Sequence, residues 1–234
     1  MDPLRVTFSL TTPMVQSAFP IHLDALIAYA VTAKALAQGG EGRGSEKLRA
    51  LASNLPLGSE TREGKTVWQA SALMSEIVSD AGIRMWTRKT NPYDYAERIA
   101  NGDIKSRTKV DDMKPYALKI DTQRGILKNS FQFYPVRMVH QVVAWCMGDI
   151  DELEDLLHPE AGWLTHIGAR GRVGHGLVSS VKIEHDPLAL ENWKLRVLPW
   201  QESAEYCQIQ AAFQPPYWAP EHREQAFCPA NLLG

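Results

Sequence analysis

The sequence predicts an α+β protein, on the evidence of four stretches of its 234 residues. Apolar and polar residues alternate over 4–10, which is the period of a half-buried strand. Residues 21–38 follow with apolar side chains at helical spacing. A helix over 149–164 and an alternating strand over 177–185 come late in the chain. A strand that leads directly into a helix at the start favours an α+β unit over a single-class fold.

The first strand and helix have recognisable ends. Thr11-Thr12-Pro13 closes the strand, Pro20 precedes the helix, and Gly39-Gly40 stops it. Residues 39–65 are rich in Gly, Ser, Glu and Arg without a sustained period. We expect them to form an exposed connection or a short helix.

The middle of the chain is expected to contain strands at 67–74, 83–89 and 137–147, the last being buried and ending at Gly148. A hairpin is predicted over 114–133, around the polar turn 121–125. The final residues, 187–234, contain many prolines and tryptophans, and we expect an ordered but irregular segment. Since no clear linker divides the chain, residues 1–234 are predicted to be one domain.

Composition excludes several classes of protein. Hydrophobic residues make up 44% and charged residues 22%, so a disordered or fibrous chain is excluded. No run approaches 18 uninterrupted apolar residues, so no membrane span is expected. Asp2 and the alternating start do not fit a signal peptide, and three scattered cysteines fit neither a disulfide framework nor a zinc ribbon. We expect a cytoplasmic protein in a reducing setting, with no membrane partner.

The charge is unevenly distributed along the chain. The formal net charge is −2, but residues 84–137 hold 12 Lys and Arg against 6 Asp and Glu, and the remainder holds 13 against 21. One interpretation is an insertion that faces a polyanion, carried on an acidic body. The other is chance clustering on a solvated face.

The strongest local motif is the stretch Gly168-Ala169-Arg170-Gly171-Arg172-Val173-Gly174-His175-Gly176. Its glycines remove side-chain bulk, so that a ligand can approach main-chain amides, and its arginines and histidine are donors suited to phosphate. It is neither a Walker loop nor a dinucleotide fingerprint, because the GK[ST] ending is absent and a strand follows. The alternative interpretation is a tight turn between helix and strand with solvated arginines.

The order of elements and this loop, of the form IGxRxxVGxGxV, resemble the RAMP superfamily of CRISPR proteins, which use ferredoxin-like (RNA-recognition-motif-like) folds. The segment PIHLDALIAYA, directly after the first strand, resembles the Cas-five-type subunit of type IV CRISPR complexes. The resemblance covers residues 3–184, with its motifs in 3–30 and 145–181. It implies a modified ferredoxin-like fold in which 84–137 forms an inserted, basic, thumb-like hairpin region.

The resemblance implies a non-catalytic subunit that caps the 5′ handle of a crRNA. Its partners would be the crRNA, a Cas-seven-type backbone subunit and a large, Cas-eight-type subunit, with contact to target DNA left open. No metal and no cofactor are expected. Tyr93, Tyr95 or Tyr116 could stack on splayed bases. The residues expected to bind RNA are Gly168, Arg170, Gly171, Arg172, Gly174, His175, Gly176, His22, Arg88, Lys89, Lys105, Arg107, Lys109, Lys114, Arg124 and Lys128.

His22 leaves a choice open. Related RAMP endoribonucleases use a histidine near the first helix as general acid or base, a role that suits its pKa near 6.5. The other interpretation is that His22 or Asp24 caps the helix, or that His22 contacts RNA. Two alternatives to a subunit that caps the crRNA handle therefore remain. One is a crRNA-processing endoribonuclease that uses His22, and the other is a protein-interaction module without RNA.

Overall fold

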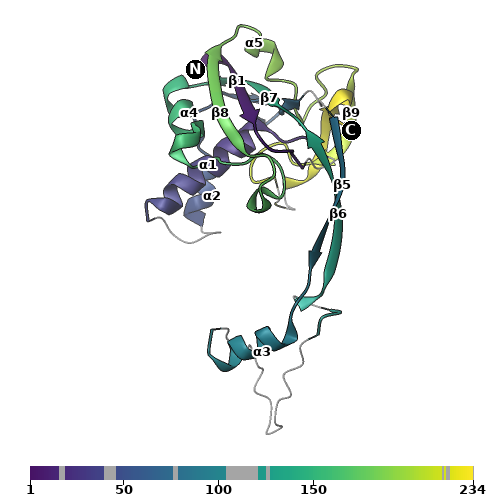
Figure 1. Ribbon diagram of the computed structural model, residues 1–234. Helices are drawn as coiled ribbons and strands as arrows, with labels where there is room; N and C mark the ends of the chain where they lie inside the picture. Colours follow the sequence, from purple (N-terminus) through teal and green to yellow (C-terminus); the bar gives the residue numbers. More distant parts are fainter. Residues whose placement is uncertain are drawn as a thin grey trace. The chain divides into compact units, whose positions relative to one another are not determined.

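Figure 1 shows the computed structural model, which describes residues 1–15, 19–39, 46–75, 79–103, 121–124, 127–217, 219 and 222–233. It contains two compact units, Met1–Gly82 with Val136–Gly234, and Ile83–Pro135. The elements are β1 (Asp2–Leu10), α1 (Leu23–Ala37), α2 (Glu46–Ala52), β2 (Ser59–Arg62), β3 (Lys65–Trp68), β4 (Met74–Ser75), β5 (Ser79–Arg88), α3 (Pro92–Ala100), β6 (Ser130–Met138), β7 (Gln141–Gly148), α4 (Ile150–Leu157), η2 (Pro159–Ala161), η3 (Gly171–Val173), β8 (Val178–His185), α5 (Ala189–Asn192), β9 (Tyr206–Ala211), β10 (Glu224–Pro229) and η5 (Ala230–Leu232). Helices and antiparallel sheets together confirm the predicted α+β class.

A four-stranded antiparallel sheet forms the centre of the larger unit, with the order β4-β7-β1-β8. Leu4, Val6 and Phe8 on β1 are fully buried, which confirms the predicted alternation. Helices α1 and α4 contact each other and contribute to the same hydrophobic core as β1 and β7. Burial of one such side chain contributes about 1.5–3 kcal/mol, so this shared core holds both helices against the sheet (Figure 1).

The two core helices end where the sequence provides a stop. Gly39, which follows the C-cap residue Gln38 of α1, has φ +85° and donates its amide to the Leu36 carbonyl, as expected of a helix-terminating glycine. At the start of α4, the Asp149 side chain accepts from the Glu152 amide at 3.0 Å. The predicted helix over 149–164 stops at Leu157, because the residue before Pro159 is pushed out of the helical region.

One expectation for the middle of the chain is wrong in detail, and another is confirmed only in part. The single strand predicted over 137–147 is two strands, since β6 ends at Met138 and β7 begins at Gln141. The chain changes partner between them, from β5 to β1 and β4. Within 39–65, α2 is the expected short helix. The expectation did not include β2, which pairs with β3 across a two-residue turn in which Glu63 and Gly64 have φ of 51° and 77°. Both positive φ values are typical of a tight hairpin turn.

The C-terminal segment 187–234 is not irregular as expected. It contains α5 and the antiparallel pair β9 and β10. A second hydrophobic cluster forms around Trp193, Leu198 and Phe213. Trp193 and Trp200 therefore belong to a second core, which also includes Val67 of β3.

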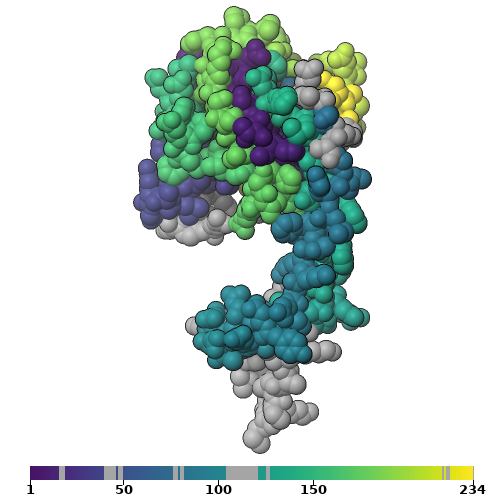
Figure 2. Space-filling view, in the orientation of Figure 1, coloured from purple at the N-terminus to yellow at the C-terminus, as the bar shows by residue number. Residues whose placement is uncertain are grey.

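The smaller unit, Ile83–Pro135, holds α3 and most of the two-stranded sheet β5-β6. Asn91 caps α3 by accepting from the Tyr93 amide at 3.1 Å, and the helix has no buried residue. Figure 2 shows the surface of α3 in blue-green. Residues 104–120 and 125–126 lie outside the described residues, and they include nine of the twenty residues of the hairpin predicted over 114–133. In the described part, β6 pairs with β5.

Candidate nucleic-acid interface

The glycine-rich loop over 168–176 is tied at both ends to the segment that follows β1. Ala169 donates its amide to Val15, and Gly176 donates to Pro13, both at 2.9 Å. Ile167 closes the base of the loop by donating to Gly176 at 2.8 Å. The loop is therefore a fixed feature of the surface, in which Arg172 and Gly174 are exposed and Arg170 is half-buried.

The glycines of the loop serve different purposes. A Cβ on Gly176 would lie 1.9 Å from the Ile167 carbonyl oxygen, and one on Gly168 would lie 2.6 Å from that of Val15. At these two positions glycine lets one stretch of chain approach another, which corrects the expectation that all the glycines clear space for a ligand. Of the four loop glycines, only Gly174 is a position where a Cβ would meet open space.

Replacement of Gly176 with alanine should destabilise the protein by more than 2 kcal/mol, because a backbone clash adds to the cost of about 1–2 kcal/mol for a side chain at φ +69°. Gly174→Ala is the matched control, since φ is +87° with nothing within 4 Å, and should cost about 1–2 kcal/mol. Urea unfolding measures both. Equal losses of stability in the two variants would mean that the loop moves to accommodate the alanine side chain at position 176.

The loop presents donors that could hold an anion. Arg170 adopts a left-handed backbone with φ +66° and precedes η3. The amides of Gly171 and Arg172 donate to no acceptor among the described residues. A guanidinium beside amide donors suits a phosphate oxygen. His175 lies half-buried, with its Nδ1 3.2 Å from the Pro13 carbonyl oxygen.

His22 lies in the interior, 4% exposed. It occupies the position before α1, but its side chain makes no capping hydrogen bond, so the capping interpretation of His22 is wrong. Its Nε2 accepts from the Val197 amide at 3.1 Å, and its ring stacks on Tyr217 with centroids 4.8 Å apart. Burial, together with the charge of Arg196, holds the pKa of His22 well below its usual range.

We expect stability to fall with acidification because of His22. Its depressed pKa in the folded state means that the unfolded chain binds the proton more readily, so the stabilisation is present above about pH 6.5 and is lost as pH falls towards the lower folded value. The steepest loss is about 1.4 kcal/mol per pH unit. Urea unfolding between pH 7 and 5 measures it.

His22→Gln is the control, since its amide oxygen can accept from Val197 without titrating. In this variant, the free energy of unfolding should depend less on pH below pH 6.5. An unchanged profile in this variant would show that other groups carry the effect.

A buried ionic network lies next to His22. Arg196 and Asp24 are both fully buried and lie 3.0 Å apart, and the Tyr217 hydroxyl donates to Asp24 at 2.9 Å. Arg196 also donates to four backbone carbonyls, those of Trp68, Ala70, Val197 and Phe213. Burial raises the pKa of Asp24, and the opposing charge of Arg196 works against that rise. Burial alone would lower the pKa of Arg196, but the interactions with Asp24 and Tyr217 together outweigh burial, and the pKa is raised.

This network joins three distant parts of the chain, and sequence reasoning missed Arg196 and Tyr217. Asp24 lies on α1, Arg196 follows α5, and Tyr217 lies between β9 and β10. A signal was present, because Asp24 stands between Leu23 and Ile27 on the apolar face of the predicted helix. A buried acid of this kind requires a partner.

The chain was also compared with known families. The family described as CRISPR type IV associated protein Csf3 matches residues 2–229. The chain belongs to this family. The match spans nearly the whole sequence and confirms the resemblance to a Cas-five-type subunit of a type IV CRISPR complex. A search of the curated proteins gives no match.

In this Csf3-family chain, several of the predicted RNA contacts lie in the smaller unit, Ile83–Pro135. Arg88, Lys89, Arg124 and Lys128 are exposed there. Tyr93 is 87% exposed and Tyr95 is half-buried. Lys105, Arg107, Lys109, Lys114 and Tyr116 lie outside the described residues. The bounds of this unit differ from those of the predicted insertion 84–137 by one residue at the start and two at the end.

In the described residues of the Csf3-family chain, the side chains that could bind a metal ion or react as a thiol are those of His, Cys, Asp and Glu. No group of three or more His, Cys, Asp or Glu among them could hold an ion. Cys146 is buried, which raises the pKa of its thiol to about 12. None of the helices in the described ranges is both long and apolar enough to span a bilayer.

Proposed function

We propose that this Csf3-family protein is a non-catalytic subunit that binds the 5′ handle of a crRNA in a type IV complex and thereby aids binding of the DNA target. The observation that carries the proposal is the anchored loop with half-buried Arg170 and exposed Arg172. The amides of Gly171 and Arg172 in this loop have no acceptor among the described residues. Main-chain amides and arginines bind the phosphates of any sequence, so they fix the RNA backbone in place.

The sheet supports a modified ferredoxin-like fold. Read from its other edge, the order is β8-β1-β7-β4, all antiparallel. With α1 after β1 and α4 between β7 and β8, the core elements follow the order strand, helix, two strands, helix, strand. This order matches the split βαβ arrangement of ferredoxin-like domains, and the unit Ile83–Pro135 comes between β4 and β7 in the chain.

The properties of the unit Ile83–Pro135 are consistent with a thumb-like insertion that contacts the RNA. Its exposed cations Arg88, Lys89, Arg124 and Lys128 suit phosphates, and the exposed ring of Tyr93 suits stacking on a base. A Cas-seven-type backbone subunit and a large, Cas-eight-type subunit are the proposed protein partners. They would extend the ribonucleoprotein beyond the handle.

The position of His22 argues against the endoribonuclease alternative. A general acid or base must reach the proton that it transfers, but His22 is 4% exposed and its Nε2 is occupied by the Val197 amide. The described groups thus favour binding without catalysis.

Incubation of the purified full chain with repeat-derived RNA tests the proposal. We expect RNA that carries the handle to bind roughly tenfold more tightly than the same RNA without it, and the RNA to stay intact. Cleavage that His22→Gln abolishes would support the endoribonuclease instead. Absence of binding would favour a protein-interaction module.

A further inference from the structure

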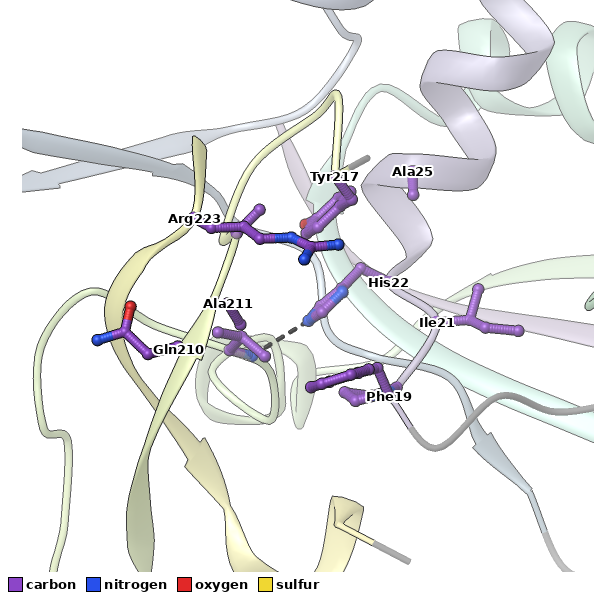
Figure 3. Close-up of a pocket in the computed structure, with 11 residues that line it drawn as sticks. Phe19, Ile21, His22, Ala25, Gln210, Ala211, Tyr217 and Arg223 are labelled. Carbon is purple, nitrogen blue, oxygen red and sulfur yellow. Dashed lines mark hydrogen bonds between the residues drawn. The ribbon is translucent and has the colours of Figure 1, made fainter. Parts of the chain in front are cut away.

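A pocket of about 280 Å³ opens in the larger unit, where the start of α1 meets the C-terminal layer. It is small for a drug-sized ligand, whose pockets are typically larger, but it has room for one planar ring. Figure 3 shows its labelled residues, with Arg223 beside Tyr217 on one side, Phe19 on the other and His22 between them.

The walls of the pocket are mostly apolar or aromatic. Pro20, Ile21 and Val197 contribute aliphatic surface, and the Phe19 ring at the rim is 56% exposed. An exposed aromatic ring at the mouth of an apolar pocket offers a stacking face at little further entropic cost.

The polar groups of the pocket fit a nucleotide better than an apolar side chain. The Arg223 guanidinium and the Gln210 amide are both exposed, and none of the described lining residues is acidic. Arg223 has no ion-pair partner among the residues that the structure describes. A carboxamide can pair with the edge of a base, since it both donates and accepts, and a guanidinium can pair with a phosphate.

The pocket lies close to the glycine-rich loop. Val15, which accepts from the loop residue Ala169, is only four residues before Phe19. Four residues span at most about 14 Å, which a few nucleotides cover at roughly 3.4 Å each in a stacked strand. One RNA strand can therefore reach from the loop to the pocket.

We propose that this pocket holds one unstacked base of the bound RNA, with Phe19 stacking on the base, Gln210 at its edge and Arg223 on the adjoining phosphate. The inference rests on the proposed function, because it requires a bound RNA strand. The pocket would add a base-specific contact to the sequence-independent contacts of the loop. Proteins usually recognise single-stranded RNA through such contacts to unstacked bases.

A scan of abasic sites along the handle tests this proposal. In wild type, one position should lower the affinity roughly tenfold when its base is removed. In Phe19→Ala, the same abasic RNA should bind as well as intact RNA. Ala25→Leu, which keeps Phe19 but fills the pocket from α1, should give the same result. Leu188→Ala, which removes an apolar side chain of similar exposure at 63% outside the pocket, should keep the wild-type penalty.

2-Aminopurine placed at that position reports stacking independently of affinity. Its fluorescence should fall on binding to wild type and fall less on binding to Phe19→Ala. If wild type binds the handle but no abasic site matters, or if the penalty survives in both pocket variants, the inference is wrong while the proposed function stands. If wild type does not bind the handle, both fail.

Discussion

Replacement of Arg196 with alanine is expected to lower the free energy of unfolding by about 3–5 kcal/mol. The Asp24 carboxylate, fully buried, would lose its counter-ion. The carbonyls of Trp68, Ala70 and Phe213 would each lose a donor. Since an unpaired buried charge is far costlier than a broken surface pair, the loss should be a large part of the total stability. Urea unfolding with circular dichroism measures it.

Two further variants show whether the network itself is responsible. Glu184→Ala breaks the ion pair with Lys182, whose side chain is 71% exposed, and should cost less than about 1 kcal/mol. Asp24→Leu combined with Arg196→Met removes both charges and should recover part of the loss from Arg196→Ala. A cost below about 1 kcal/mol for Arg196→Ala would contradict the buried network.

The double substitution Arg170→Ala and Arg172→Ala is expected to weaken RNA binding roughly a hundredfold without unfolding the protein. A hydrogen bond to a charged group contributes about 1.5–3 kcal/mol, or at least tenfold for each arginine. If both contact phosphates, the dependence of log affinity on log salt should also become shallower by about 1.4, since each phosphate contact contributes about 0.7 on a single strand. Fluorescence anisotropy from 50 to 300 mM salt measures both quantities.

Lys182→Ala is the matched control for this loss, because it removes an exposed cation of β8 that lies outside the loop. It should leave the salt dependence nearly unchanged. An equal loss in both variants would indicate a general electrostatic effect of the acidic body. Unchanged RNA binding in the loop variant would show that Arg170 and Arg172 do not contact the phosphates of the RNA.

The core of the fold could be predicted because it follows local rules. The alternation in β1, the capping Asp149 and the terminating Gly39 each act within a few residues of their own element. The helix and strand that flank the loop, α4 and β8, were found for the same reason. The exposed position of Arg172 agrees with a motif rich in glycine and charge.

The remainder depends on contacts between distant residues, which one sequence does not display. The sequence leaves His22 open to a role in chemistry, but it is buried because Val197 and Tyr217, nearly two hundred residues later, contact it. The pairing of β9 with β10 was missed for a similar reason, since twelve residues separate the strands and their apolar positions are few. Gly168 and Gly176 are glycines because Val15 and Ile167 lie against them.

Photocrosslinking tests most directly whether the glycine-rich loop holds the RNA. 4-Thiouridine placed at successive positions of the handle would be crosslinked to the full chain, and the modified peptides identified by mass spectrometry. We predict that one or two adjacent positions crosslink within residues 168–176, and that Arg170→Ala with Arg172→Ala removes these products. Crosslinks confined to residues outside the loop, with the same affinity in the double variant, would contradict the account.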